Sequence, residues 1–344
     1  MTPADALPTL DDWRDWFDAM ARFKHAAPWC TIEDHQLFAV CAPDDPSHTV
    51  FCHVLGIDGV RCGLSIFMGA HGFYTFCSIY GGTFDFSTFD CISMTYTPRN
   101  ALIELAPYVN DAAAALGVTF DTGSEWPSVL RYVPYLVDHQ PSAQDLHLAV
   151  YCIEHVIDVA TRVHTGTLSL PSWRDKRILT RVPARADATL HWTDEVRPIS
   201  APPPSRRLAP VPPPPLFLDQ VRATCTQSPA TWDYDCRVFA ARIKRQPSYP
   251  DLLLCINAGN RHVYGPRIFE HTDDWRTVPQ EFMQLLLAAG EYPTVLAVRT
   301  PALADVLQPS ADALGIRIRS VDHLPRFDAM YVHLLKSLHE SQRR

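Results

Sequence analysis

The sequence predicts two globular domains: an α+β domain with an antiparallel sheet, then an α/β domain with a mixed sheet. Residues 1–199 combine short β-rich runs with long amphipathic segments, and residues 216–344 follow the order β-β-α-β-α-β-α. Between them, residues 200–215 (SAPPPSRRLAPVPPPP) are dominated by proline, which favours an extended, semi-rigid chain. We therefore predict a proline-rich linker at 200–215.

Length and composition support this division. The chain has 344 residues, 47% of them hydrophobic, which is enough for two cores. Its net charge of -8 is uneven: residues 1–200 carry 13 Lys/Arg against 24 Asp/Glu, whereas residues 216–344 carry 15 against 14. An acidic domain repels phosphate backbones, so any nucleic-acid binding is expected from the C-terminal domain only.

In the N-terminal domain, aromatic and aliphatic residues at three- and four-residue spacing predict a helix over Leu10–Ala26. A second strong amphipathic helix is predicted over Asp145–His164. The turn signals APDDPSH and GIDG separate β-rich runs, which is typical of an antiparallel meander. The other predicted elements are strands at 37–41, 49–56, 60–68, 91–96, 178–182 and 189–193, and helices at 69–80 and 99–116.

In the C-terminal domain, a hairpin is predicted around AGNR, with helices that end at Gly290 and Gly315. The predicted strands are 252–257, 262–269, 294–299 and 316–321, and the predicted helices are 278–289, 302–314 and 327–341. This order is compatible with a ribonuclease-H-like fold, whose nucleases hold two divalent metals with carboxylates at strand ends. Asn257, Arg299 and Thr300 occupy the matching strand ends, and none of these side chains carries the negative charge that a divalent metal needs from its ligands.

Two groups of residues are candidate binding sites. Trp126, Tyr132 and Tyr135 are candidates for a ligand groove, against the alternative that they belong to the core. A basic group is a candidate patch for phosphate or an acidic partner, against the alternative of a solvated, charge-protected edge strand. Its members are Arg237, Arg242, Lys244, Arg245 and Arg261.

No motif in the sequence indicates a cofactor, a metal or a catalytic residue. Zinc-binding spacings and phosphate-binding glycine loops are missing, and none of the ten cysteines forms a C-x-x-C pair. Asp219, Asp233 and Asp235 remain candidate metal ligands, but a cap or turn acid and two solvated residues are the simpler interpretation. The missing secretion signal and the absence of a long apolar run predict a cytoplasmic protein that does not bind membranes.

Three blocks of sequence resemble a bacterial family that is known only as paired domains of unknown function. The first block runs from FKHAAPW to HVLGIDGVRCGLSIFMGAHGF, and the second is EWPSVLRYVPYLVD. The third combines PPPPLFLDQVRAT with QPSYPDLLLCINAGNRHVYG and YPTVLAVRTPALADVL. The resemblance covers nearly the whole chain and implies the same two-domain division, but it implies no activity.

Together these observations predict a non-catalytic binding or interaction protein, with an unknown protein as its partner. The alternative is a metal-dependent nuclease or other hydrolase with a degenerate ribonuclease-H-like C-terminal domain. Three or more carboxylates around a common point at the strand ends would favour the alternative.

Overall fold

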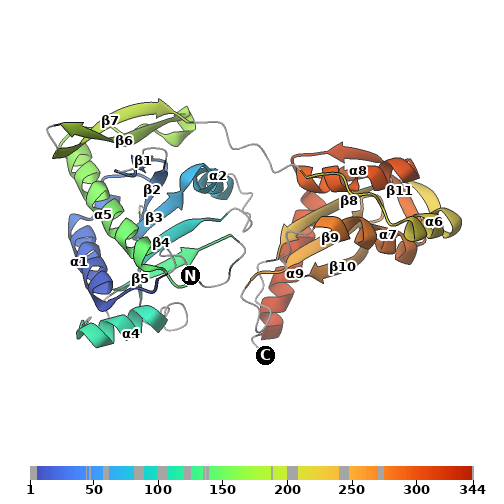
Figure 1. Cartoon of the computed structure of the whole chain (residues 1–344), viewed down its shortest axis with the longest axis horizontal. Coiled ribbons are helices and arrows are strands. Elements are labelled where there is room, and N and C mark those ends of the chain that lie inside the picture. Colours follow the sequence, from blue (N-terminus) through green and yellow to red (C-terminus); the bar gives the residue numbers. More distant parts are fainter. Residues whose placement is uncertain are drawn as a thin grey trace. The chain divides into compact units, whose positions relative to one another are not determined.

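The fold is described from a computed structural model of the chain (Figure 1). The residues described are 6–43, 45, 48–56, 62–80, 89–98, 107–119, 125–134, 136, 139–186, 189–199, 208–239, 248–269 and 275–342. The chain divides into two compact units, Met1–Pro203 and Pro204–Arg344, and the division falls within residues 200–215.

The first unit contains a seven-stranded sheet in the order β5-β4-β3-β2-β1-β6-β7. Its strands are β1 (Leu37–Cys41), β2 (Thr49–Leu55), β3 (Gly63–Met68), β4 (Cys91–Pro98), β5 (Glu125–Tyr132), β6 (Arg177–Ala186) and β7 (Thr189–Pro198). The prediction of an antiparallel sheet was wrong at one place, because β1 and β6 pair in parallel. The chain crosses from β5 to β6 through a long helix and adds β6 beside the first strand, so the sheet is mixed.

Helices cover both faces of this sheet (Figure 1). The first unit contains α1 (Leu10–Ala26), α2 (Gly69–Tyr80), α4 (Pro107–Leu116), α5 (Ala143–His164) and the short 3-10 helices η2 (Pro28–Cys30) and η3 (Trp173–Asp175). Residues of α1, α4 and α5 belong to one buried cluster, and residues of α2 belong to a second cluster with different strand residues. The sheet is therefore the middle layer of three.

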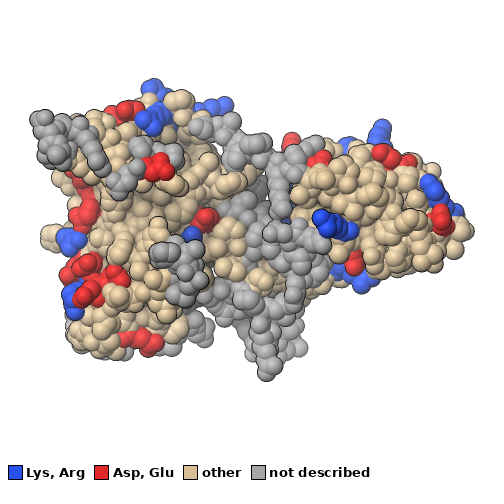
Figure 2. All heavy atoms as spheres, viewed as in Figure 1, with Lys and Arg blue, Asp and Glu red and all other residues tan. Residues whose placement is uncertain are grey.

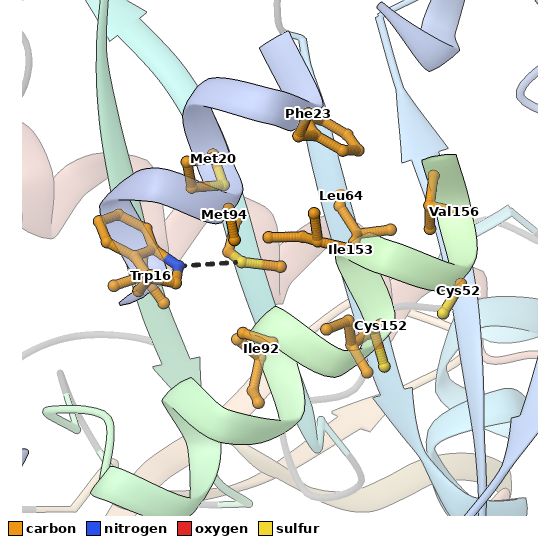
Figure 3. Close-up of a cluster of buried hydrophobic side chains, with 14 of the residues drawn as sticks. Trp16, Met20, Phe23, Cys52, Leu64, Ile92, Met94, Cys152, Ile153 and Val156 are labelled. Atoms are coloured by element: carbon orange, nitrogen blue, oxygen red, sulfur yellow. Dashed lines mark hydrogen bonds between the residues drawn. The ribbon is translucent and has the colours of Figure 1, made fainter. Parts of the chain in front are cut away.

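The predicted helices α1 and α5 are confirmed, and each has strong local signals. Both begin with a capping box, formed by Thr9 with Asp12 and by Ser142 with Asp145, which satisfies backbone N–H groups that the helix leaves free. The apolar stripe of α1 is buried, and Trp16 at its centre donates from Nε1 to Met94 Sδ at 3.3 Å (Figure 3). This packing fixes α1 on the sheet.

The second unit contains a five-stranded sheet in the order β10-β9-β8-β11-β12. The strands are β8 (Thr226–Val238), β9 (Asp251–Asn257), β10 (Val263–Phe269), β11 (Glu291–Val298) and β12 (Arg317–Ser320). β9 is antiparallel to β8 and β10, whereas β11 is parallel to β8 and β12. The predicted mixed sheet is confirmed, but its central strand, β8, is not among the predicted elements.

Helices lie on both faces of the second sheet as well. They are α6 (Pro215–Thr224), α7 (Val278–Ala289), α8 (Pro301–Leu314), α9 (Pro325–Gln342) and the 3-10 helix η4 (Trp275–Thr277). Buried residues of α6, α7 and α8 pack together on one face, whereas α9 packs with Phe239, Leu254 and Ala297 on the other. Helix α6 begins at Pro215, the last residue of the predicted linker.

Two further observations concern the whole described chain. All ten cysteines are free thiols. Among the described residues, no helix is both long enough and apolar enough to cross a membrane.

Candidate functional site

Strand β8 carries charged residues on the face that α9 covers. Trp232, Tyr234 and Val238 alternate with Asp233, Asp235 and Arg237, and successive side chains of a strand point to opposite faces. Trp232 and Tyr234 are fully buried with α7 and α8. The acids are buried as well: Asp233 is 3% exposed and Asp235 is 0% exposed. Their interpretation as solvated residues was therefore wrong.

Asp235 lies at the centre of the sheet and is bound by two donors from the end of β11. Arg299 Nη2 lies 2.6 Å from Asp235 Oδ2, and the Thr300 hydroxyl donates to Asp235 Oδ1 at 2.8 Å. Burial raises the pKa of Asp235, and the attraction of Arg299 together with hydrogen bonds from Thr300, Arg299 and the backbone of Cys236 opposes that rise. All of these partners favour the carboxylate form.

Arg299 also binds the first turn of α9. Its Nη1 lies 2.9 Å from Asp328 Oδ1, and Arg237 Nη1 lies 3.4 Å from the same oxygen. Burial lowers the pKa of Arg299, but the charges of Asp235 and Asp328 outweigh this effect and raise it. The guanidinium of Arg237 also stacks over the ring of Tyr331, 4.6 Å from its centroid.

Asp233 is bound separately by α9, because Arg326 Nη1 lies 3.1 Å from its Oδ2. The charged cluster, as we call these residues, consists of Asp233, Asp235, Asp328, Arg237, Arg299 and Arg326. Each carboxylate contacts at least one guanidinium, so the three negative charges are matched by three positive ones. Arg326 is the most accessible arginine of the charged cluster, with a side chain that is 47% exposed.

In this arrangement each aspartate already contacts an arginine. A hard divalent cation needs several anionic oxygens, and the neighbouring guanidinium charges oppose its binding. Among the described residues, no group of three or more His, Cys, Asp or Glu side chains is placed to hold a metal ion.

Asn257 and Arg299, the two predicted strand ends, lie on different faces of the sheet. Asn257 pairs with Trp232 and donates to Tyr264 on the face that carries α7 and α8. Its Oδ1 accepts from Gly259 N at 2.8 Å, so it closes the turn between β9 and β10. Asn257 therefore has a structural role, and Asp235 is the residue beside Arg299.

The candidate basic patch is divided. Arg237 pairs with Leu252 at the start of β9, whereas Arg261 lies in the turn that follows Asn257 at its other end. Arg237 points into the charged cluster, and Arg261 is exposed with a φ of 61°. Arg242, Lys244 and Arg245 lie outside the described residues.

The candidate ligand groove is divided in a similar way. Trp126 and Tyr132 are six positions apart on β5, which corresponds to about 20 Å of strand. Trp126 packs against the cluster that contains α1 and α5, whereas Tyr132 packs against the cluster that contains α2 and contacts Phe89. Tyr135 lies outside the described residues.

The sequence contained one signal for the strand that carries the two buried aspartates. The run TWDYDCRV at 231–238 alternates apolar and charged residues, which is typical of a strand with two different faces. Arg299, Arg326 and Asp328 come from segments 60 or more positions away in the chain, so no spacing rule connects them to β8.

Comparison with protein families matches both units. A domain of unknown function, DUF7309, covers residues 13–181, and a second, DUF6930, covers residues 218–335. No curated protein matches the chain, and no solved structure matches it either. The predicted resemblance to paired domains of unknown function is thereby confirmed.

Proposed function

For a chain that belongs through its two domains to the families DUF7309 and DUF6930, we propose a non-catalytic binding or protein-interaction function. The observation that carries this proposal is the contact of Arg299 with Asp235 at 2.6 Å. This contact occupies the centre of the site, where a ribonuclease-H-like nuclease would need a carboxylate that is not paired with an arginine.

The second unit supports the proposal through its topology. Its strand order, with β9 antiparallel and helices after β10, β11 and β12, is the arrangement that we associate with a ribonuclease-H-like domain. In nucleases of this architecture, carboxylates on the central strands bind the metals that bracket the phosphate. Asp233 and Asp235 occupy the central strand here, but arginines neutralise both.

The same residues define the alternative function. Three aspartates do lie in one region, and Arg326 is partly exposed, so its displacement by a ligand would free Asp233. A hydrolase of this kind would become active only after its arginines move. The alternative therefore predicts metal-dependent cleavage of nucleic acid, and this cleavage should increase when an arginine of the charged cluster is replaced.

Charge distribution favours a protein over nucleic acid as the partner of the first unit. Asp11, Asp15 and Asp18 are exposed on α1, and Figure 2 shows acidic side chains gathered at this side of the unit. This surface repels phosphate backbones. Binding to nucleic acid, if it occurs, is assigned to the second unit.

A nuclease assay separates the two functions. Wild type, Arg299→Met and Asp235→Asn are incubated with single- and double-stranded DNA and RNA in Mg²⁺ or Mn²⁺. Arg222→Met is the matched control, because Arg222 is exposed and, among the described residues, contacts only a carbonyl oxygen, that of Ala313. We expect no cleavage by any of the four proteins. Cleavage by wild type or Arg299→Met that Asp235→Asn abolishes would refute the non-catalytic function.

A further inference from the structure

Strand β7 forms an open edge of the first sheet. It is the last strand in the sheet order, it is ten residues long, and among the described residues it pairs only with β6. Figure 1 shows it at the outer margin of the sheet. A long edge strand presents unpaired N–H and C=O groups to any partner strand.

The other edge strands of the two sheets carry features that oppose pairing with a further strand. β5 contains Pro127, and an isolated antiparallel β-bridge joins its Arg131 to His139. β10 contains Pro266 and an irregular register between Tyr264 and Arg267, and β12 has only four residues. Pro198, the only proline of β7, is its last residue, so the rest of this edge is open.

The ladder with β6 identifies which groups face outward. Ile199 N donates to Lys176 O, and the register continues with Pro198 opposite Arg177. Because bonded pairs alternate along an antiparallel ladder, odd-numbered residues of β7 bond to β6 and even-numbered residues from 190 to 196 point their N–H and C=O groups outward.

The side chains on the two sides of Thr193 would match each other in a pair of antiparallel β7 strands. Leu190 and Val196 lie three positions to either side and are unusually exposed for large apolar residues, at 41% and 43%. His191 and Glu195 lie two positions to either side. An antiparallel copy centred on Thr193 would place Leu190 opposite Val196 and His191 opposite Glu195, which are both favourable cross-strand pairs.

Neighbouring registers lack this match. A shift that centres the pairing on Asp194 would place Leu190 opposite Pro198 and His191 opposite Arg197. A shift that centres it on Trp192 would place Leu190 opposite Asp194. Like any register centred on a residue, the one centred on Thr193 pairs even-numbered residues with even-numbered ones, so its outward groups find partners; only the side-chain pairs distinguish it from its neighbours.

The inner side of β7 holds the strand in position. Asp194 binds Arg162 and Arg181, and the ring of Trp192 lies 4.5 Å from that of His155 on α5. Arg197 contacts Oε2 of Glu195 through Nη2 at 2.9 Å and Nε at 3.0 Å, and Oε1 of Glu195 can accept from an incoming histidine. The edge is therefore preorganised for pairing.

We propose that β7 is a homotypic interaction surface: two copies of the chain pair through antiparallel β7 strands with the two-fold axis at Thr193. The two seven-stranded sheets thereby become one continuous sheet. Such an interface is isologous, because each residue contacts its symmetry partner. A single strand edge buries less area than a standard interface, so the dimer is expected to dissociate with a Kd on the order of 10 μM.

Sedimentation of the full chain over a concentration series tests the pairing. Wild type should dimerise, and Val196→Pro should raise the Kd about tenfold or more, because it removes an outward N–H without removing a bond to β6. Ile268→Lys, which changes an equally exposed apolar residue on β10, is the control and should dimerise like wild type. Wild type that is monomeric at about 100 μM, ten times the expected Kd, would overturn the proposal.

Charge exchange tests the register. A chain with Leu190→Lys and Val196→Lys should be monomeric, whereas one with Leu190→Lys and Val196→Glu should dimerise again because opposite charges then face each other. Thr193→Cys should form an intermolecular disulfide at 193 under mild oxidation, since Cα atoms of such a pair lie about 4.5 Å apart. Equal crosslinking by His191→Cys, or a dimer that these changes leave intact, would contradict this interface.

Discussion

Replacement of Arg299 by methionine is the perturbation that tests the charged cluster most strongly. The change removes the guanidinium that contacts Asp235 at 2.6 Å and Asp328 at 2.9 Å. Asp328 retains Arg237, but Asp235 loses its cation and retains hydrogen bonds from the Thr300 hydroxyl and the Cys236 backbone. The side chain of Asp235 is 1% exposed, so its charge has little contact with water.

The expected cost follows from this burial. Removing one member of a buried ion pair typically costs about 3–5 kcal/mol, because the remaining charge stays desolvated. The side chain of Arg299 is 24% exposed, so we expect the lower limit, about 3 kcal/mol. For a unit of this size, the midpoint of thermal unfolding should fall by on the order of 10 °C.

Urea unfolding of the full chain, followed by hydrogen exchange in peptides from β8, measures this cost in the second unit alone. The double variant Arg299→Met with Asp235→Leu removes both charges and should recover most of the lost stability. Arg222→Met is again the control and should change the free energy of unfolding by less than about 0.5 kcal/mol. A cost below about 1 kcal/mol for Arg299→Met would refute the assignment of a buried ion pair.

The pH dependence of the same variant has a definite sign. Burial already raises the pKa of Asp235, and loss of Arg299 removes a main opposing influence, so this pKa should rise further. A carboxyl whose folded pKa exceeds its unfolded pKa favours folding at low pH and loses that contribution as pH rises through the folded pKa. The deficit of Arg299→Met relative to wild type should therefore be smaller at pH 5 than at pH 8.

Three further predictions concern other parts of the chain. Limited trypsin digestion should cut at Arg206 or Arg207 and leave two stable fragments, as judged by mass spectrometry, because residues 200–215 lack apolar periodicity. Burial lowers the pKa of His155 to about 4, so the free energy of unfolding of the first unit should fall as pH drops from about 6.5 to 4. His155→Phe should reduce this dependence on pH, as measured by urea titrations at several pH values. Trp16→Ala should destabilise the first unit by about 3–5 kcal/mol, since the ring is fully buried, and a thermal midpoint equal to wild type would contradict this packing.

The sequence predicted most elements whose signals are local. The bounds of α1 are those expected from its stripe, because the capping box and the spacing of Trp13, Trp16 and Met20 act within one segment. The hairpin of β9 and β10 was located for the same reason. The parallel pairing of β1 with β6 was missed, because strand neighbours that are far apart in sequence leave no periodic pattern.

The charged cluster was missed for a different physical reason. Asp233 and Asp235 resemble solvated acids when their sequence neighbourhood is considered alone. They are buried because Arg299 and Arg326, contributed by the end of β11 and the start of α9, compensate their charge. Only the alternation around Trp232 indicated a strand, and that pattern does not reveal its partners.

A manganese-soaked crystal of the full chain tests whether the charged cluster can bind a metal, because the anomalous signal of the metal locates it. We expect no manganese peak among Asp233, Asp235 and Asp328, with Arg299 still bound to Asp235. A peak about 2.1 Å from a carboxylate oxygen of Asp235, with the guanidinium of Arg299 displaced, would show a working metal site and contradict the non-catalytic function.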